Sequence, residues 1–212
     1  MIIYLHGFRS SPQSAKARIL DAAMRARHQE ARWHCPQLPA SPAQALQHVN
    51  TLIRTGQTET GLDPARELVL IGSSLGGYYA TCLAEHWRCR AVVLNPVVHA
   101  ARDLATQVGH HTQYHSDEPF VFLPRHVDEL ADMAAARPLQ PERYYLLAAT
   151  GDEVLDWRDM VDWYAGCHGR LLHGGDHGLS DFERWLPEIL DFALAPGDAP
   201  SLTKAHFVRE SH

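Results

Sequence analysis

The sequence has no hydrophobic run of the length that a membrane-spanning helix needs. No stretch approaches the roughly 18 consecutive apolar residues of such a helix. Residues 1–8 (MIIYLHGF) also lack the basic segment that opens a secretory signal peptide. These absences predict a cytoplasmic protein that does not insert into a membrane.

Basic residues are too few and too scattered for a nucleic-acid interface. The chain has 19 Lys and Arg against 25 Asp and Glu, a net charge of −6, and its arginines stand singly along the sequence. Phosphate backbones and anionic lipids attract clustered positive charge. The sequence therefore predicts neither a nucleic-acid partner nor an anionic membrane partner.

Cysteine is also sparse. The four cysteines lie far apart and form no C-x-x-C pair, which speaks against a disulfide framework and a zinc ribbon (Cys35, Cys82, Cys89 and Cys167). We expect reduced, mostly buried thiols.

The histidine count is high, at 15, and raises the question of a metal site. His111 and His115 lie four residues apart, but no glutamate or cysteine with ligand spacing accompanies them. We expect solvated histidines on a mobile lid, and no metal.

Short apolar runs alternate with segments of helical composition, which predicts an α/β fold. The expected strands are continuous apolar runs, typical of strands buried on both faces (2–5, 31–35, 68–72, 91–94, 144–150 and 170–173). The expected helices lie between them (13–28, 42–54, 75–87, 157–165 and 179–194). We predict one domain, residues 1–194, with a mainly parallel sheet of about six strands and helices on both faces.

One interval is too long for an ordinary crossover between strands. It predicts a small lid insertion at about 97–141, with a helix over 127–136 preceded by a loop over 110–119. Residues 195–212 contain two prolines and no periodicity, which predicts a mobile C-terminal tail.

The glycine-rich turn in residues 68–80 (LVLIGSSLGGYYA) fits neither phosphate-binding motif. A P-loop needs Lys and Ser/Thr where this chain has Tyr78 and Tyr79. The dinucleotide motif needs a middle glycine where this chain has Ser74. No cofactor is expected.

The same turn fits G-x-S-x-G, the sharp strand-to-helix turn that exposes a nucleophilic serine. Ser74 has glycine two residues away on each side, Gly72 and Gly76, where larger side chains would collide. Ser73 has Ile71 and Leu75 at those positions, so Ser74 is the predicted nucleophile.

A nucleophilic serine needs a histidine base and a carboxylate that orients it. Asp152 follows the expected strand 144–150, and His177 lies in a glycine-rich loop after the strand 170–173. We predict that these two residues complete a catalytic triad with Ser74. Glu153 and Asp156 share the Asp152 loop and are the competing acids there. Asp156 is expected to cap a helix, Asp176 to form a turn, and His173 to be structural.

Two backbone N–H groups are expected to form the oxyanion hole, those of Leu75 and Phe8. His6 could serve as a base, but a structural role in the loop after the first strand is the favoured interpretation. Aromatic side chains of the turn and the lid are candidates for an acyl pocket, or else plain core residues (Phe8, Tyr78, Phe120 and Phe122).

Five segments resemble the small bacterial esterases of the YqiA type within the α/β-hydrolase superfamily (YLHGFRSSPQSAKA, LIGSSLGGYYAT, LNPVV, ATGDEVLDWR and GGDHGLSDFE). The resemblance spans residues 2 to about 193. It implies a compact hydrolase fold, with Ser74, Asp152 and His177 as the triad and RHVDEL, residues 125–130, in the lid region.

The expected activity is hydrolysis of small-molecule acyl esters through an acyl-enzyme intermediate, without a metal or organic cofactor. Two alternatives remain open: an acyl-CoA thioesterase or amidase on the same triad, and a hydrolase scaffold that only binds.

Overall fold

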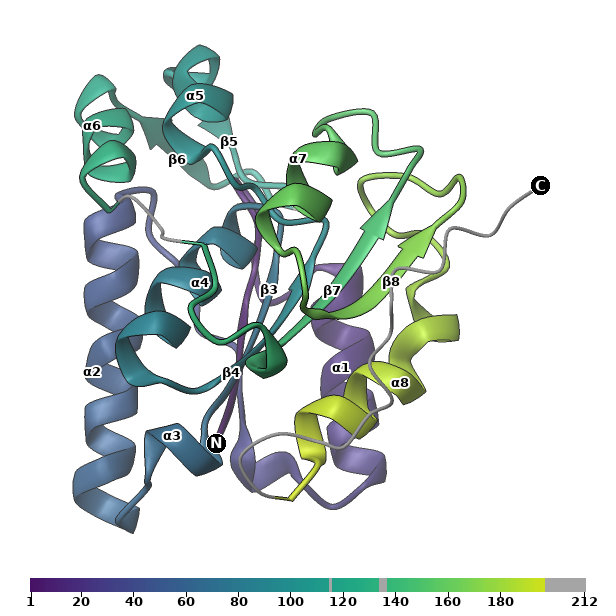
Figure 1. The fold of residues 1–212 in the computed structure, drawn as a ribbon. Coiled ribbons are helices and arrows are strands. Elements are labelled where there is room, and N and C mark those ends of the chain that lie inside the picture. Colours follow the sequence, from purple (N-terminus) through teal and green to yellow (C-terminus); the bar gives the residue numbers. More distant parts are fainter. Residues whose placement is uncertain (115, 134–136, 197–212) are drawn as a thin grey trace.

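A six-stranded sheet forms the centre of the computed structural model, which describes residues 1–114, 116–133 and 137–196 (Figure 1). All neighbouring strands in this sheet pair in parallel, in the order β2-β1-β3-β4-β7-β8. The strands are β1 (Ile2–Leu5), β2 (Trp33–His34), β3 (Val69–Ser73), β4 (Arg90–Leu94), β7 (Tyr144–Ala149) and β8 (His168–Leu172). The prediction of a parallel sheet of about six strands is confirmed.

Helices cover both faces of this sheet (Figure 1). Helices α1 (Ala15–Ala26) and α8 (Phe182–Leu194) pack on one face. Helices α2 (Pro42–Thr60), α4 (Leu75–Trp87) and α7 (Trp157–Trp163) pack on the other. Alternate residues of each central strand enter the two cores: Ile2 and Tyr4 of β1 face α1 and α8, whereas Ile3 and Leu5 belong to the other core. Burial on both faces explains the continuous apolar runs of the sequence.

The two Ser-Pro pairs of the N-terminal half behave differently. Ser41 caps α2, since its side chain accepts a hydrogen bond from the Gln44 N–H at 3.3 Å and Pro42 begins the helix. Helix α1 instead begins at Ala15, after Ser14, so the expected start at residue 13 is slightly early. Pro12 lies in the preceding turn.

The segment from 97 to 141 contains more regular structure than the sequence predicted. It holds α5 (Ala100–Leu104), the antiparallel hairpin β5 (Gly109–Thr112) and β6 (Pro119–Phe122), and α6 (Pro124–Met133). The loop expected over 110–119 is therefore wrong at both ends, because backbone pairing with β6 makes a strand of GHHT, which lacks an apolar pattern. The helix expected over 127–136 begins earlier, and residues 134–136 lie outside the described residues.

Short helices complete the fold: α3 (Pro64–Glu67) and the 3-10 turns η1 (Glu30–Arg32), η2 (Ala105–Gln107) and η3 (Pro141–Arg143). Of the expected C-terminal tail, residues 197–212 lie outside the described part of the chain. Within the described residues, every helix is too short or too polar to cross a membrane.

Hydrogen bonds at Glu129 and Leu130 attach helix α6 to α2 and α4. One Glu129 carboxylate oxygen accepts hydrogen bonds from the Ser41 hydroxyl at 2.7 Å and the Ala43 N–H at 3.0 Å, at the first turn of α2. The Tyr78 hydroxyl of α4 donates to the Leu130 carbonyl at 2.9 Å. Helix α6 is thus held against α2 and α4.

Candidate active site

The predicted site residues lie at one edge of the sheet, just beyond the carboxyl ends of its strands. The strand ends are nearly level, since Leu5 is opposite Gly72, Ser73 is opposite Leu94, and Ala149 is opposite Leu172. This edge is where open parallel sheets bind their ligands. Ser74, Asp152 and His177, which are far apart in the sequence, each follow one of these ends.

Ser74 occupies a strained turn between β3 and α4. Its backbone angles are φ 55° and ψ −122°, in a region that residues with a side chain seldom adopt. The N–H of Ser74 donates to the Leu94 carbonyl at 3.0 Å, and its carbonyl accepts from Val97 at 3.1 Å. The turn is therefore held by the end of β4 and by the residues that follow it.

Glycine is required on both sides of this turn. A Cβ atom on Gly72 would lie 2.1 Å from the Gly76 carbonyl oxygen, and one on Gly76 would lie 1.9 Å from the Leu5 carbonyl oxygen. Both contacts are with backbone, which cannot move aside as a flexible side chain can. Ser73 is buried as the last residue of β3.

The side chains of Ser74, His177 and Asp152 form a continuous chain of hydrogen bonds. The Ser74 Oγ lies 3.0 Å from His177 Nε2, and His177 Nδ1 lies 2.8 Å from Asp152 Oδ2. A neutral imidazole with its proton on Nδ1 donates to the carboxylate and accepts from the serine hydroxyl. His177 is 21% exposed and the Asp152 side chain is 0% exposed.

Backbone N–H groups of the loop after β7 hold the Asp152 carboxylate. Its Oδ1 accepts hydrogen bonds from the N–H groups of Val154 and Leu155, both at 2.8 Å. The second oxygen remains for His177. These two bonds hold the Asp152 side chain in place independently of its contact with His177.

The competing acids have other partners. Asp156 caps α7 by accepting from the Arg158 N–H at 2.9 Å. Glu153 accepts from the backbone N–H of His177 at 3.0 Å, and not from its imidazole. Asp176 accepts hydrogen bonds from the Ser180 hydroxyl and, at 2.9 Å, from the Ser180 N–H, and these bonds, chiefly that of the hydroxyl, lower the pKa of the Asp176 carboxyl. His173 is exposed, one residue beyond the end of β8.

The loop after β1 lies against Ser74. A Cβ atom on Gly7 would lie 3.3 Å from the Ser74 Cβ and 3.8 Å from its Oγ. Within the described residues, the N–H groups of Phe8 and Leu75 have no hydrogen-bond partner. Leu75 opens α4, where N–H groups point out of the helix and carry partial positive charge.

His6 ties this loop to the neighbouring segment. It is 3% exposed; its Nε2 lies 3.0 Å from the Leu38 N–H, and its Nδ1 lies 3.1 Å from the Gly7 carbonyl oxygen. The Leu38 N–H can donate only to an unprotonated Nε2, so this imidazole is neutral. Burial lowers the pKa of His6 to about 4, which agrees with that state.

The buried His6 predicts a loss of stability in mild acid. Its pKa is lowered in the folded protein from an ordinary 6.5 to about 4, so the unfolded chain takes up the proton first. The contribution is fully present above pH ~6.5 and decreases by up to about 3 kcal/mol as the pH falls to ~4. Urea unfolding of the wild type and His6→Gln across this range measures it. The variant should show a shallower pH dependence, and parallel curves would contradict the prediction.

Aromatic rings pack where the hairpin meets the loop after β1. The ring of Phe8 makes edge-to-face contacts with Phe120 and Phe122, each with a centroid distance of 5.1 Å, and with His111 at 5.8 Å. Phe120, Phe122 and Tyr78 are buried, whereas Phe8 is half-buried. Phe8 thus joins two of the three other predicted pocket residues, and their contact with substrate stays a prediction.

Polar contacts join the same two segments. The Arg9 Nε donates to the Thr112 carbonyl at 2.8 Å, and the Tyr114 N–H donates to the Arg9 carbonyl at 2.7 Å. The Arg9 guanidinium also lies 4.6 Å from the centre of the Tyr114 ring. The hairpin and the residues that follow β5 therefore hold Arg9, the residue after Phe8, in place.

The histidine-rich stretch does not gather ligands in the described part of the chain. His111 Nε2 lies 2.7 Å from the Gln107 carbonyl oxygen, and His115 lies outside the described residues. Among residues 1–114, 116–133 and 137–196, no three His, Cys, Asp or Glu side chains are grouped as a metal site would need.

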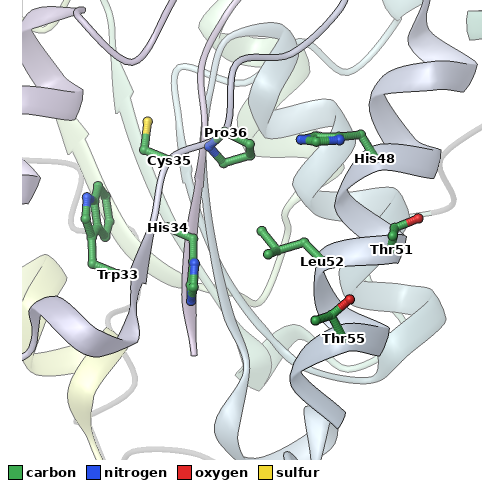
Figure 2. A pocket seen from close by; sticks show the side chains of 8 residues that line it. All are labelled: Trp33, His34, Cys35, Pro36, His48, Thr51, Leu52 and Thr55. Carbon is green, nitrogen blue, oxygen red and sulfur yellow. The ribbon is translucent and has the colours of Figure 1, made fainter. Parts of the chain in front are cut away.

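A groove of about 500 Å³ lies elsewhere, between the edge strand β2 and helix α2 (Figure 2). His34 and Cys35 line it from the strand side, and His48, Leu52 and Thr55 from the helix. β2 is two strands away from β3, whose end carries Ser74. The groove contains none of the three hydrogen-bonded residues and is not part of the candidate site.

One residue of this edge was missed as a site residue. Asn95 directly follows β4, is fully buried, and donates from Nδ2 to the carbonyl oxygens of Asp176 at 3.0 Å and His177 at 3.2 Å. A polar residue directly after a buried strand, at the same edge as Ser74, was the available signal.

Solved structures with the same fold include several hydrolases. One of the metagenome-derived lipolytic enzymes LipS and LipT aligns with 91% of this chain and 92% of its own, with a TM-score of 0.66 and 17% identity. Est1E from Butyrivibrio proteoclasticus, in a structure with bound ferulic acid, aligns over 89% and 85%, with a TM-score of 0.62 and 11% identity.

An esterase domain of a Rhodothermus marinus protein aligns over 89% of this chain and 83% of its own, with a TM-score of 0.62 and 16% identity. These likenesses show the α/β-hydrolase fold. The sequence itself matches the Uncharacterised protein family (UPF0227) over residues 1–194, which is all but the C-terminal segment. The chain therefore has the α/β-hydrolase fold and belongs to UPF0227, the YqiA-type family.

Proposed function

We propose that this protein is a serine hydrolase that cleaves small acyl esters, with Ser74 as nucleophile, His177 as general base and acid, and Asp152 as the carboxylate that orients the histidine. The observation that carries this proposal is the hydrogen-bonded chain from Ser74 Oγ through His177 to Asp152, at 3.0 and 2.8 Å. The strained backbone of Ser74 supports the same role, because strain of this kind is typical of reactive positions.

The reaction proceeds in two acyl-transfer steps. His177 Nε2 takes the Ser74 proton while Oγ attacks the ester carbonyl, and the N–H groups of Leu75 and Phe8 donate to the oxyanion. Collapse of the tetrahedral intermediate breaks the bond to the alcohol, which receives the proton from His177. Water, deprotonated by His177, then attacks the acyl-serine, and the acid leaves as Ser74 regains its proton.

Two further observations concern the substrate and the cellular compartment. The half-buried side chain of Phe8, whose N–H is one of the two proposed oxyanion donors, suits an apolar acyl group. All four cysteines are free thiols, as expected for a cytoplasmic protein. We propose a small-molecule ester as substrate.

Labelling with a fluorophosphonate tests the nucleophile directly. The probe transfers its phosphonyl group to an activated serine, with loss of fluoride, so we expect a single adduct and peptide mapping to Ser74. An adduct on Ser73, or none in a folded protein, would contradict the assignment. Initial rates on p-nitrophenyl esters and CoA thioesters of matched chain length then separate an esterase from a thioesterase.

A further inference from the structure

A single buried side chain, that of Asn95, bonds to two of the strand ends and loops that carry the proposed triad. Asn95 follows β4 and has a left-handed backbone conformation, with φ 40°. Its N–H donates to the Leu147 carbonyl at 2.9 Å, and the preceding carbonyl, that of Leu94, accepts from Ser74. Asparagine tolerates this conformation better than most residues.

Both ends of the Asn95 side-chain amide are hydrogen-bonded. Its Oδ1 accepts from the Ala149 N–H at 2.8 Å, at the end of β7 and three residues before Asp152. Its Nδ2 donates to the carbonyl oxygens of Asp176 at 3.0 Å and His177 at 3.2 Å. The reverse amide orientation would turn an oxygen toward two carbonyls, so the network fixes the orientation.

The histidine loop needs such a contact because its sequence allows many conformations. Gly174 and Gly175 both have positive φ, at 78° and 77°, and are exposed. Two other side chains bond to the loop backbone at His177 and the next residue, and both are partly or fully exposed: Glu153 accepts from the His177 N–H, and the Lys16 ammonium donates to the Gly178 carbonyl. Asn95, at 0% exposure, is shielded from the water that competes for those bonds.

We propose that Asn95 is a positioning residue, which sets the backbone of His177 so that the imidazole meets Ser74 and Asp152 together. This inference rests on the proposed function. Asn95 contacts the His177 backbone carbonyl and not the imidazole, so it acts through the loop. Displacement of a reacting group by about 1 Å can cost about 100-fold in rate.

Two variants separate positioning from general stability. Asn95→Gly keeps the left-handed backbone and removes the amide, and Asn95→Asp keeps the shape and the acceptor for Ala149 but removes the donors. We expect kcat on a p-nitrophenyl ester to fall by about 10- to 100-fold with KM nearly unchanged. The rate of fluorophosphonate labelling should fall in parallel, and the low-field proton signal of the His177–Asp152 hydrogen bond should weaken.

A matched control is Tyr164→Phe, which removes another buried hydrogen bond, at 2.6 Å to Thr81, without touching the histidine loop. It should keep kcat and labelling rate within about twofold of the wild type. If both folded Asn95 variants kept the wild-type kcat, or if Tyr164→Phe lost as much activity at an equal loss of melting temperature, the inference would be overturned. Activity remaining in Ser74→Ala would instead overturn the proposed function.

Discussion

Ser74→Ala is expected to reduce kcat on a p-nitrophenyl acyl ester by about 10⁴-fold or more, with little change in stability. The variant loses the proposed nucleophilic oxygen, Ser74 Oγ, while His177 and Asp152 keep their contact at 2.8 Å. Alanine also fills less space than serine in a turn whose contacts are made by the backbone. Initial rates and thermal melting of the same preparation measure both effects.

The neighbouring serine supplies the matched control. Ser73 is one residue away, in the same glycine-rich turn, but belongs to β3 and is buried. Ser73→Ala should therefore keep kcat within a few-fold of the wild type. Loss of activity in both variants would show that the turn is merely sensitive to substitution, and loss in Ser73→Ala alone would reassign the nucleophile.

The central strands of the sheet were predictable because burial on both faces leaves continuous apolar runs in the sequence. All six expected strands are present, and helix α4 begins and ends where the composition indicated, at Leu75 and Trp87. The hairpin β5 and β6 was not predictable, because GHHT has no apolar alternation and gains its strand conformation from pairing with residues 119–122.

That Ser74, Asp152 and His177 lie close together was predictable for a different reason. Each follows the carboxyl end of a parallel strand, and the level ends of those strands bring such residues together whatever their separation in sequence. The same rule applies to Asn95, but a lone asparagine after a strand has no motif. Its role depends on the carbonyl groups of the histidine loop, whose path the sequence does not specify.

Gly76→Ala is expected to destabilise the fold by about 3 kcal/mol or more, although alanine normally favours a helix. The added methyl carbon would lie 1.9 Å from the Leu5 carbonyl oxygen and 2.7 Å from that of His6. Relief requires α4 to move away from the end of β1, which would also separate Ser74 from the loop containing Phe8. Activity should therefore fall together with the free energy of unfolding, measured by urea titration.

Gly56→Ala is the control for this change, because it makes the same substitution inside another helix. In α2 the new methyl carbon would lie 2.9 Å from the Cε of Met1 and 3.3 Å from a Leu62 methyl, both at the ends of flexible side chains. The gain in helix propensity, up to about 1 kcal/mol, should offset the adjustment, leaving stability nearly unchanged. Equal destabilisation by the two substitutions would mean that the close approach of α4 to β1 is not what requires glycine at position 76.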